Sequence, residues 1–165
     1  AVARSARVYG KAAAMVWEVA PLRSPERGSS VRYTVMIEGA RADGEGGYAW
    51  RDKVVFSMTA PELPQLLAVL MGWIEAVEFR FHSGSPKKNM ALRHQSSGVV
   101  VHLQGLTQAL AVPVSDADRY ALANLVLHTM VANEPLSSAE AVLRVCRAVM
   151  TRPAFGAGSA TTPAP

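Results

Sequence analysis

The sequence predicts an α+β fold in which runs of antiparallel strands are followed by helices. Apolar and polar residues alternate through most of the chain, and this period of two is typical of half-buried strands. Glycine-rich and Ser/Pro-rich stretches separate these runs, as hairpin loops do. Two segments, KVVFSMTAPEL and ALAVPVSDADR, each lead from a strand through a capping sequence into a helix, 56 residues apart. The chain is therefore expected to form strands and then a helix, twice.

The predicted strands fall into two groups. Those of the first group cover residues 15–19, 30–38, 48–50 and 54–58. Those of the second group cover residues 77–81, 90–92, 99–103 and 106–112. The run at 30–38 is the clearest, because every second residue from Val31 to Ile37 is apolar.

Three helices are predicted, and each opens with a hydroxyl side chain at the N-cap and an acid three residues later. The capping pairs are Thr59 and Glu62, Ser115 and Asp118, and Ser137 and Glu140. Residues at helical spacing, all apolar except Thr129, follow each pair. They are Leu63, Leu66, Leu67 and Leu70 in the first helix; Leu122, Leu125, Val126, Thr129 and Met130 in the second; and Val142, Leu143, Cys146, Val149 and Met150 in the third.

Length and composition limit the protein classes that fit. A chain of 165 residues, half of them apolar, suggests one domain with a real core and short tails. No apolar run approaches the ~18 residues that a membrane span requires, so no membrane partner is expected. Cys146 is the single cysteine, which excludes an internal disulfide and a cysteine zinc site and fits a reducing or organellar interior.

The net charge of +4 is concentrated at the two ends of the chain. Residues 12–134 hold 11 basic and 12 acidic side chains, so the central body is nearly neutral. A basic surplus favours an anionic partner, and here it is modest. The first residues, AVARSAR, are Arg-rich and lack acids, which is the composition of an organellar transit peptide or of a short disordered basic arm. We expect an organellar protein, mitochondrial rather than plastid.

Four segments resemble the Whirly family of single-stranded DNA-binding proteins. They are YGKAA at residues 9–13, YAWRDKVVFS at 48–57, EFRFH at 78–82 and VPV at 112–114. The family's corresponding patterns are Lys-Gly-Lys-Ala-Ala, Tyr-x-Trp…Lys…Val-Phe-Ser, Glu-Phe-Phe-His and Val/Ile-Pro-Ile/Val. They occur here in the family's order, and the resemblance covers roughly residues 8–131.

The resemblance implies two four-stranded antiparallel sheets packed like propeller blades, each followed by a helix. It also implies tetramerisation through the helices, and bases lying on apolar and aromatic strand surfaces with little sequence preference. The mitochondrial RNA-binding proteins of kinetoplastids share this architecture, so the resemblance implies single-stranded DNA or RNA as the ligand. We accordingly divide the chain into a basic N-terminal arm (1–7), a Whirly-like domain (8–131), a C-terminal helical extension (132–152) and a low-complexity tail (153–165).

This sequence departs from the family pattern at three places. Tyr9 stands where the signature has its first lysine. Ala-Asn-Glu-Pro at 132–135 replaces the Gly-Trp that commonly closes the second helix. A third helix around residues 137–150 has no counterpart in the pattern, and we expect it to dock on a neighbouring subunit or particle rather than on its own domain.

Single-strand binders use aromatic faces for base stacking and cations that follow the backbone. The candidate residues are Tyr9, Gly10, Lys11, Tyr48, Trp50, Lys53, Phe81, His82, Lys87, Lys88 and Arg93. The alternative for each aromatic residue is core packing, and this is favoured for Phe81 because it shares the apolar face of Val77 and Phe79. Lys11 is the strongest candidate, because it follows a glycine inside the signature segment.

No catalytic constellation is visible, so we expect neither an enzyme nor a cofactor, metal or small-molecule substrate. The four histidines, His82, His94, His102 and His128, lack metal-ligand spacing. The chain has no Gly-x-Ser-x-Gly elbow that could present a nucleophile. The glycine-rich segment GARADGEGG leads to a strand, whereas phosphate cradles lead to a helix N-terminus.

The prediction is an organellar protein that binds single-stranded DNA or RNA by stacking and backbone contacts, and that assembles as a homotetramer. One alternative is a structural RNA-binding subunit of a mitochondrial ribonucleoprotein particle such as the mitoribosome, which the neutral body and the added helix favour. A second alternative is an oligomeric scaffold that binds no nucleic acid.

Overall fold

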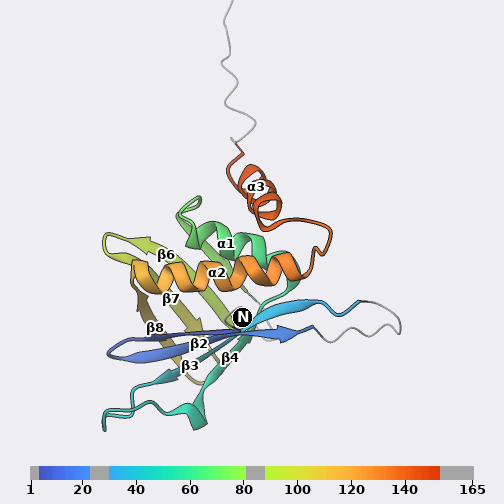
Figure 1. Ribbon diagram of the computed structural model, residues 1–165. Helices are drawn as coiled ribbons and strands as arrows, with labels where there is room; N and C mark the ends of the chain where they lie inside the picture. Colours follow the sequence, from blue (N-terminus) through green and yellow to red (C-terminus); the bar gives the residue numbers. More distant parts are fainter. Residues whose placement is uncertain (1–3, 23–29, 81–87, 153–165) are drawn as a thin grey trace, which may run out of the picture.

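The computed structural model describes residues 4–22, 30–80 and 88–152 of the 165 (Figure 1). Its elements follow the predicted order of four strands, a helix, four strands and a helix, with a further C-terminal helix. Two layers result, because the helices cover one side of a pair of sheets that lie against each other (Figure 1). Among the described residues no helix is both long and apolar enough to cross a membrane.

The first sheet is four-stranded and antiparallel, in the order β1-β2-β3-β4. Its strands are β1 (Ser5–Tyr9), β2 (Ala13–Pro21), β3 (Tyr33–Arg41) and β4 (Val54–Ser57). The register aligns Ala6, Trp17, Ile37 and Phe56 in one row across the sheet. The three large side chains of this row are fully buried, so this is the face that meets the core.

The second sheet repeats the arrangement in the order β5-β6-β7-β8, again antiparallel. Its strands are β5 (Ala76–Phe79), β6 (Asn89–Gln95), β7 (Gly98–Gln104) and β8 (Ala109–Val114). A row of buried residues, Phe79, Met90, Leu103 and Leu110, crosses its inner face. The two four-stranded sheets that the sequence predicts are therefore confirmed.

The helices are α1 (Leu63–Leu70), α2 (Asp116–Ala132) and α3 (Ala139–Met150), and short 3-10 turns occur at Trp50–Asp52 (η1) and Ala60–Glu62 (η2). Helix α2 contacts α1 as well as strands of both sheets. It is the element that ties the two repeats together across the molecule (Figure 1).

Two of the predicted helix caps form as expected. The Glu62 side chain accepts a hydrogen bond from the backbone N–H of Thr59 at 2.7 Å, completing a capping box ahead of α1. Ser115 Oγ accepts from the backbone N–H of Asp118 at 3.2 Å. The third cap is one residue later than predicted, because Ser138 Oγ accepts from Ala141 N at 3.1 Å whereas Ser137 N donates to Glu134 O within the preceding turn.

The first group of strands differs from the prediction in one member. Residues 48–50 do not form a strand, since only Tyr48 makes an isolated bridge, to Ala42, before η1 begins. The missing strand is β1, which lies largely within the segment predicted to be a basic arm at residues 1–7. It forms because Ala6 and Val8 alternate with exposed residues, and this places their side chains on the core.

Helix α3 packs on its own domain, contrary to the expectation that it docks elsewhere. It contacts α1 and α2, and the buried Cys146 thiol lies 3.5 Å from the carbonyl of Pro64. Burial raises the pKa of this thiol. Val142 and Leu143 lie partly buried on the core, but Val149, which we predicted on the same apolar stripe, is 56% exposed.

The end of α2 is fastened to the start of β3 by the Asn133 side chain. Its Oδ1 accepts from Tyr33 N at 2.7 Å, and its Nδ2 donates to Tyr33 O at 2.8 Å. The Asn133 side chain therefore pairs with both backbone groups of Tyr33, in the way that a residue of a neighbouring strand would. The two residues are one hundred positions apart in sequence. Only an amide supplies both a donor and an acceptor in this geometry.

We expect Asn133→Asp to destabilise the fold by about 1–3 kcal/mol, because a carboxylate cannot donate to Tyr33 O and leaves that carbonyl unpaired. Urea unfolding at neutral pH measures the loss. Asn124→Asp is the matched control, since the hydrogen bond that the Asn124 amide makes among the described residues is to Tyr120 O within α2. Equal losses in the two variants would show that the link to Tyr33 contributes nothing specific.

Candidate nucleic-acid interface

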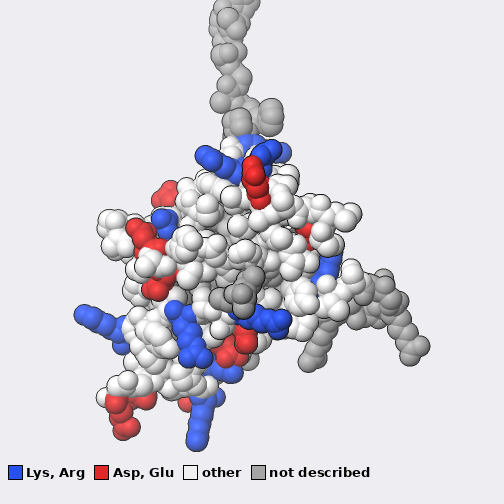
Figure 2. All heavy atoms as spheres, in the orientation of Figure 1, with Lys and Arg blue, Asp and Glu red and all other residues white. Residues whose placement is uncertain are grey.

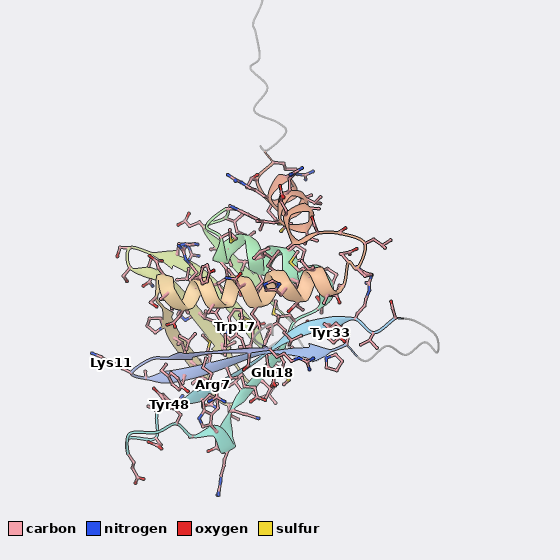
Figure 3. The ribbon with its side chains drawn as sticks, viewed as in Figure 1. Arg7, Lys11, Trp17, Glu18, Tyr33 and Tyr48 are labelled. Atoms are coloured by element: carbon pink, nitrogen blue, oxygen red, sulfur yellow. The ribbon has the colours of Figure 1, made fainter. Side chains whose placement is uncertain are left out.

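The outer face of the first sheet carries the side chains that alternate with its buried rows. Pairing aligns Arg7, Val16 and Glu38 in one row, and Ser5, Glu18 and Met36 in the next. Arg7 and Glu18 point away from the helices, whereas Trp17 lies on the opposite side of the same sheet (Figure 3). This face is therefore free of the helical layer.

Three aromatic rings gather at one end of this face. The Tyr9 and Tyr48 ring centroids are 5.9 Å apart, and those of Tyr48 and Trp50 are 6.3 Å apart, with the rings tilted in both pairs. The Tyr48 hydroxyl donates to Gly10 O at 2.8 Å, which fastens the 48–50 segment to the end of β1. Tyr9 is 61% exposed, so the cluster lies at the surface rather than in the core.

A tight loop returns the chain to this end of the sheet. Asp43 Oδ1 accepts from Glu45 N at 2.8 Å and from Gly47 N at 3.0 Å, and these hydrogen bonds lower the pKa of the Asp43 carboxyl. Gly44 and Gly46 have φ values of 83° and 93°, which only glycine adopts without strain. The segment GARADGEGG is thus a turn that positions Tyr48, and Ala49 N then donates to Arg41 O at 2.8 Å.

Beside the cluster lies a hollow of about 390 Å³ on the outer face of the first sheet. It is lined by Arg7, Tyr9, Val16, Glu18, Glu38, Trp50 and Lys53. Lys53 Nζ is 2.8 Å from Glu38 Oε1, so this cation is already paired. The hollow combines apolar and aromatic walls with two cations and two carboxylates.

Tyr9 also borders the second sheet. Tyr9 lines a second hollow, of about 240 Å³, together with residues at the ends of β7 and β8 such as Val100 and Pro113. A Cβ on Gly10 would lie 2.9 Å from Ala13 O and 3.4 Å from Pro113 Cδ, so this glycine permits the tight turn and the close approach of β8. The aromatic cluster thus sits where the outer face of the first sheet meets the edge of the second.

The structure brings six of the predicted site residues together and separates others. Tyr9, Gly10, Tyr48, Trp50 and Lys53 border the cluster or its hollow, and the exposed Lys11 lies in the turn that follows Tyr9. Lys88 lines a different hollow, of about 520 Å³, with Lys53 and the exposed Leu106. Arg93 lies on the outer face of the second sheet, opposite Ala76 and Val100. The predicted residues Phe81, His82 and Lys87 lie outside the described residues.

Sequence reasoning missed Arg7, Val16, Glu18 and Glu38, which complete the hollow. Arg7 lies in the segment 1–7, whose arginine-rich composition predicts a basic arm. The alternation of buried and exposed residues along the strands could have predicted them. Each of the four is adjacent in sequence to a buried residue of β1, β2 or β3, so its side chain points to the opposite, outer face.

Charge on this surface is balanced rather than basic. Figure 2 shows Lys and Arg side chains interleaved with Asp and Glu side chains on the visible face. Within the hollow, the Lys53–Glu38 pair leaves Arg7 and Glu18 as the remaining opposite charges. The two cations and two carboxylates of the hollow therefore balance in formal charge.

The described histidines show structural roles or plain exposure. His94 Nε2 lies 2.6 Å from Val69 O near the C-terminal end of α1, and His102 is exposed on β7. In the described parts of the chain, no group of three or more His, Cys, Asp or Glu side chains is placed to hold a metal ion.

Comparison with known proteins gives matches among solved structures alone. No protein-family model and no curated protein sequence matches this chain. The structure of the plant transcriptional regulator PBF-2 is similar at 22% identity and a TM-score of 0.56, covering 82% of this chain and 90% of that one.

Two proteins from Arabidopsis thaliana are similar to the same extent. The crystal structure of WHY1 matches at 18% identity and a TM-score of 0.61, over 77% of this chain and 82% of that one. WHY3 matches at 20% identity and a TM-score of 0.59, over 82% of this chain and 96% of that one. The resemblance first visible in four short sequence segments is thus confirmed in three dimensions, and the chain has the Whirly fold.

Proposed function

We propose that this protein binds single-stranded nucleic acid on the outer face of its first sheet, with bases stacking on the Tyr9–Tyr48–Trp50 cluster. The observation that carries the proposal is the cluster itself: three adjacent rings, one of them 61% exposed, at the rim of a surface hollow. Aromatic residues placed for core packing would be buried. The Whirly fold shared with a plant transcriptional regulator supports the same function.

The balance of charges favours single strands over duplex DNA. A duplex hides its base faces and is held mainly through its phosphates, which calls for a continuous basic surface. Unpaired bases instead offer their π-faces to aromatic rings. A hollow with equal numbers of cations and carboxylates suits the second mode. RNA and DNA single strands both present such bases, and the proposal covers both.

The proposal also includes the cellular location of the protein and its state of assembly. The protein acts in an organelle, more specifically the mitochondrion, which the acid-free, arginine-bearing residues 1–7 support. It works as a homotetramer or as an RNA-binding subunit of a larger particle such as the mitoribosome. The exposed Val145 and Val149 on α3 support assembly of either kind. Sizing the native protein before and after nuclease treatment separates the two forms.

We expect binding to unpaired oligonucleotides with a shallow dependence on salt. With two or three phosphates neutralised, the slope of log K against log[salt] is about −1.4 to −2. Fluorescence-anisotropy titrations across a salt series measure it. Tighter binding to a duplex of the same sequence, or no binding at low salt, would contradict the proposed function.

We expect Tyr9→Ala to weaken single-strand binding about fivefold or more, because it removes the most exposed ring of the cluster. Tyr120→Ala is the matched control, since Tyr120 is 74% exposed on α2 and belongs to neither ring pair of the cluster. Anisotropy titration and thermal melting on the same preparations separate binding from stability. If both variants bind equally well, stacking on the cluster is excluded.

We expect Lys11→Glu to weaken binding or higher assembly while leaving the thermal midpoint unchanged, because the side chain is exposed in the β1–β2 turn. Reversing this charge places a carboxylate beside the incoming backbone. Arg147→Glu, an exposed charge reversal on α3, serves as the control for binding. Wild-type affinity and wild-type size in Lys11→Glu would show that the lysine is dispensable.

A further inference from the structure

A carboxylate without a described partner lies in the hollow beside the aromatic cluster. Glu18 is exposed on β2 and faces the same space as Arg7 and Trp50. Its neighbour Glu38 is ion-paired with Lys53 at 2.8 Å, but no described residue forms a hydrogen bond or ion pair with the Glu18 side chain. An unpaired acid is unexpected on a surface that meets a polyanion, and it therefore calls for an explanation.

The carboxylates determine which side of a strand can enter the hollow. Phosphates are repelled by Glu18 and Glu38, so a nucleic acid bound here keeps its backbone at the rim and turns its bases inward. The exposed Lys11, in the turn that follows Tyr9, offers a cation for that backbone outside the hollow. The bases then meet the apolar side chain of Val16 and the rings of Tyr9 and Trp50.

An ionised carboxylate only accepts hydrogen bonds, and it accepts best from two donors side by side. The Watson–Crick edge of guanine presents two such donors, N1–H and the N2 amino group. Uracil and thymine present one N–H between two carbonyl oxygens, which a carboxylate repels. Adenine and cytosine each present a single amino group on this edge. Guanine is therefore the base whose edge best fits Glu18.

Arg7 completes the match. Arg7 pairs with Val16, two residues from Glu18 on the same face of β2, so the two side chains are diagonal neighbours on the sheet. Diagonal positions lie about 7–8 Å apart, which leaves room for a base edge between them. The guanidinium group donates, and guanine offers its O6 acceptor next to N1–H. One base edge can thus satisfy both charged groups.

We propose that Glu18 reads guanine at this position of the first sheet, with Arg7 as its donor partner, and that the protein therefore prefers guanine-containing single strands. The inference rests on the proposed function, because it requires that bases enter the hollow. It adds a preference at one position to a mode of binding that is otherwise insensitive to sequence.

The test compares two single strands that differ by one amino group. One is a thymine oligonucleotide with interspersed guanines, and the other has inosine in place of each guanine, which removes the N2 amino group and keeps N1–H and O6. The wild-type protein should bind the guanine strand about five- to tenfold more tightly. In the Glu18→Gln variant, the ratio of the affinities for the guanine and inosine strands should fall to nearly one. The Glu140→Gln variant, with its substitution on α3, is the matched control and should keep the wild-type ratio.

The remaining outcomes separate the inference from the function on which it rests. Equal affinity of the wild type for both strands would overturn guanine reading and leave single-strand binding standing. A Glu18→Gln variant that binds both strands more tightly but keeps their ratio would also overturn it, because the carboxylate would then act only by repulsion. Binding to neither strand would overturn the proposed function itself. Thermal melting of each variant confirms that the compared proteins are folded.

Discussion

The whole arrangement depends on one close approach between the two sheets, at Gly39. A Cβ at this position would lie 2.8 Å from Leu103 Cδ1 and 3.0 Å from Leu110 Cδ1, inside the contact distance of real side chains. Gly39 faces inward between Met15 and Val54, so the second sheet fits into the space that its missing side chain leaves. Because the sheets meet this closely, α2 can contact both of them and the core becomes continuous.

The same register that builds the core also builds the site. In β2, Trp17 is buried against Ile37 while Glu18 and Val16 face the hollow, and a shift of one residue would exchange the two sets. The free energy gained by burying Trp17 therefore also fixes where Glu18 points. A site on regular strands is held more firmly than one on loops, and the one loop involved is closed by the Asp43 hydrogen bonds.

Much of the fold could be predicted from the sequence, because its signals are local. Alternation marks strands, hydroxyl–acid pairs mark helix starts, and both signals recur 56 residues apart. The missed strand β1 shows the limit: arginines on its exposed side suggested a disordered arm, although Ala6 and Val8 alternate as a strand requires. The sequence could indicate the three aromatic residues as separate candidates, but it could not show that they form a cluster, since Tyr9 and Tyr48 meet through tertiary contacts. Glu18 carried no signal of its own, because an exposed acid in a strand is ordinarily just a solvated side chain.

The balanced charge of the proposed interface affects how much of the binding free energy comes from phosphate contacts and how much from contacts with bases. Where phosphates dominate, affinity is large, depends steeply on salt and ignores sequence. In the proposed interface, the carboxylates of Glu18 and Glu38 offset the charges of Arg7 and Lys53, so the proposal assigns the affinity to stacking and to hydrogen bonds with base edges. Base-edge hydrogen bonds are the contacts that distinguish one base from another. For a Whirly fold with a face of balanced charge, the proposed binding mode therefore predicts that affinity depends on which bases fit between Arg7 and Glu18.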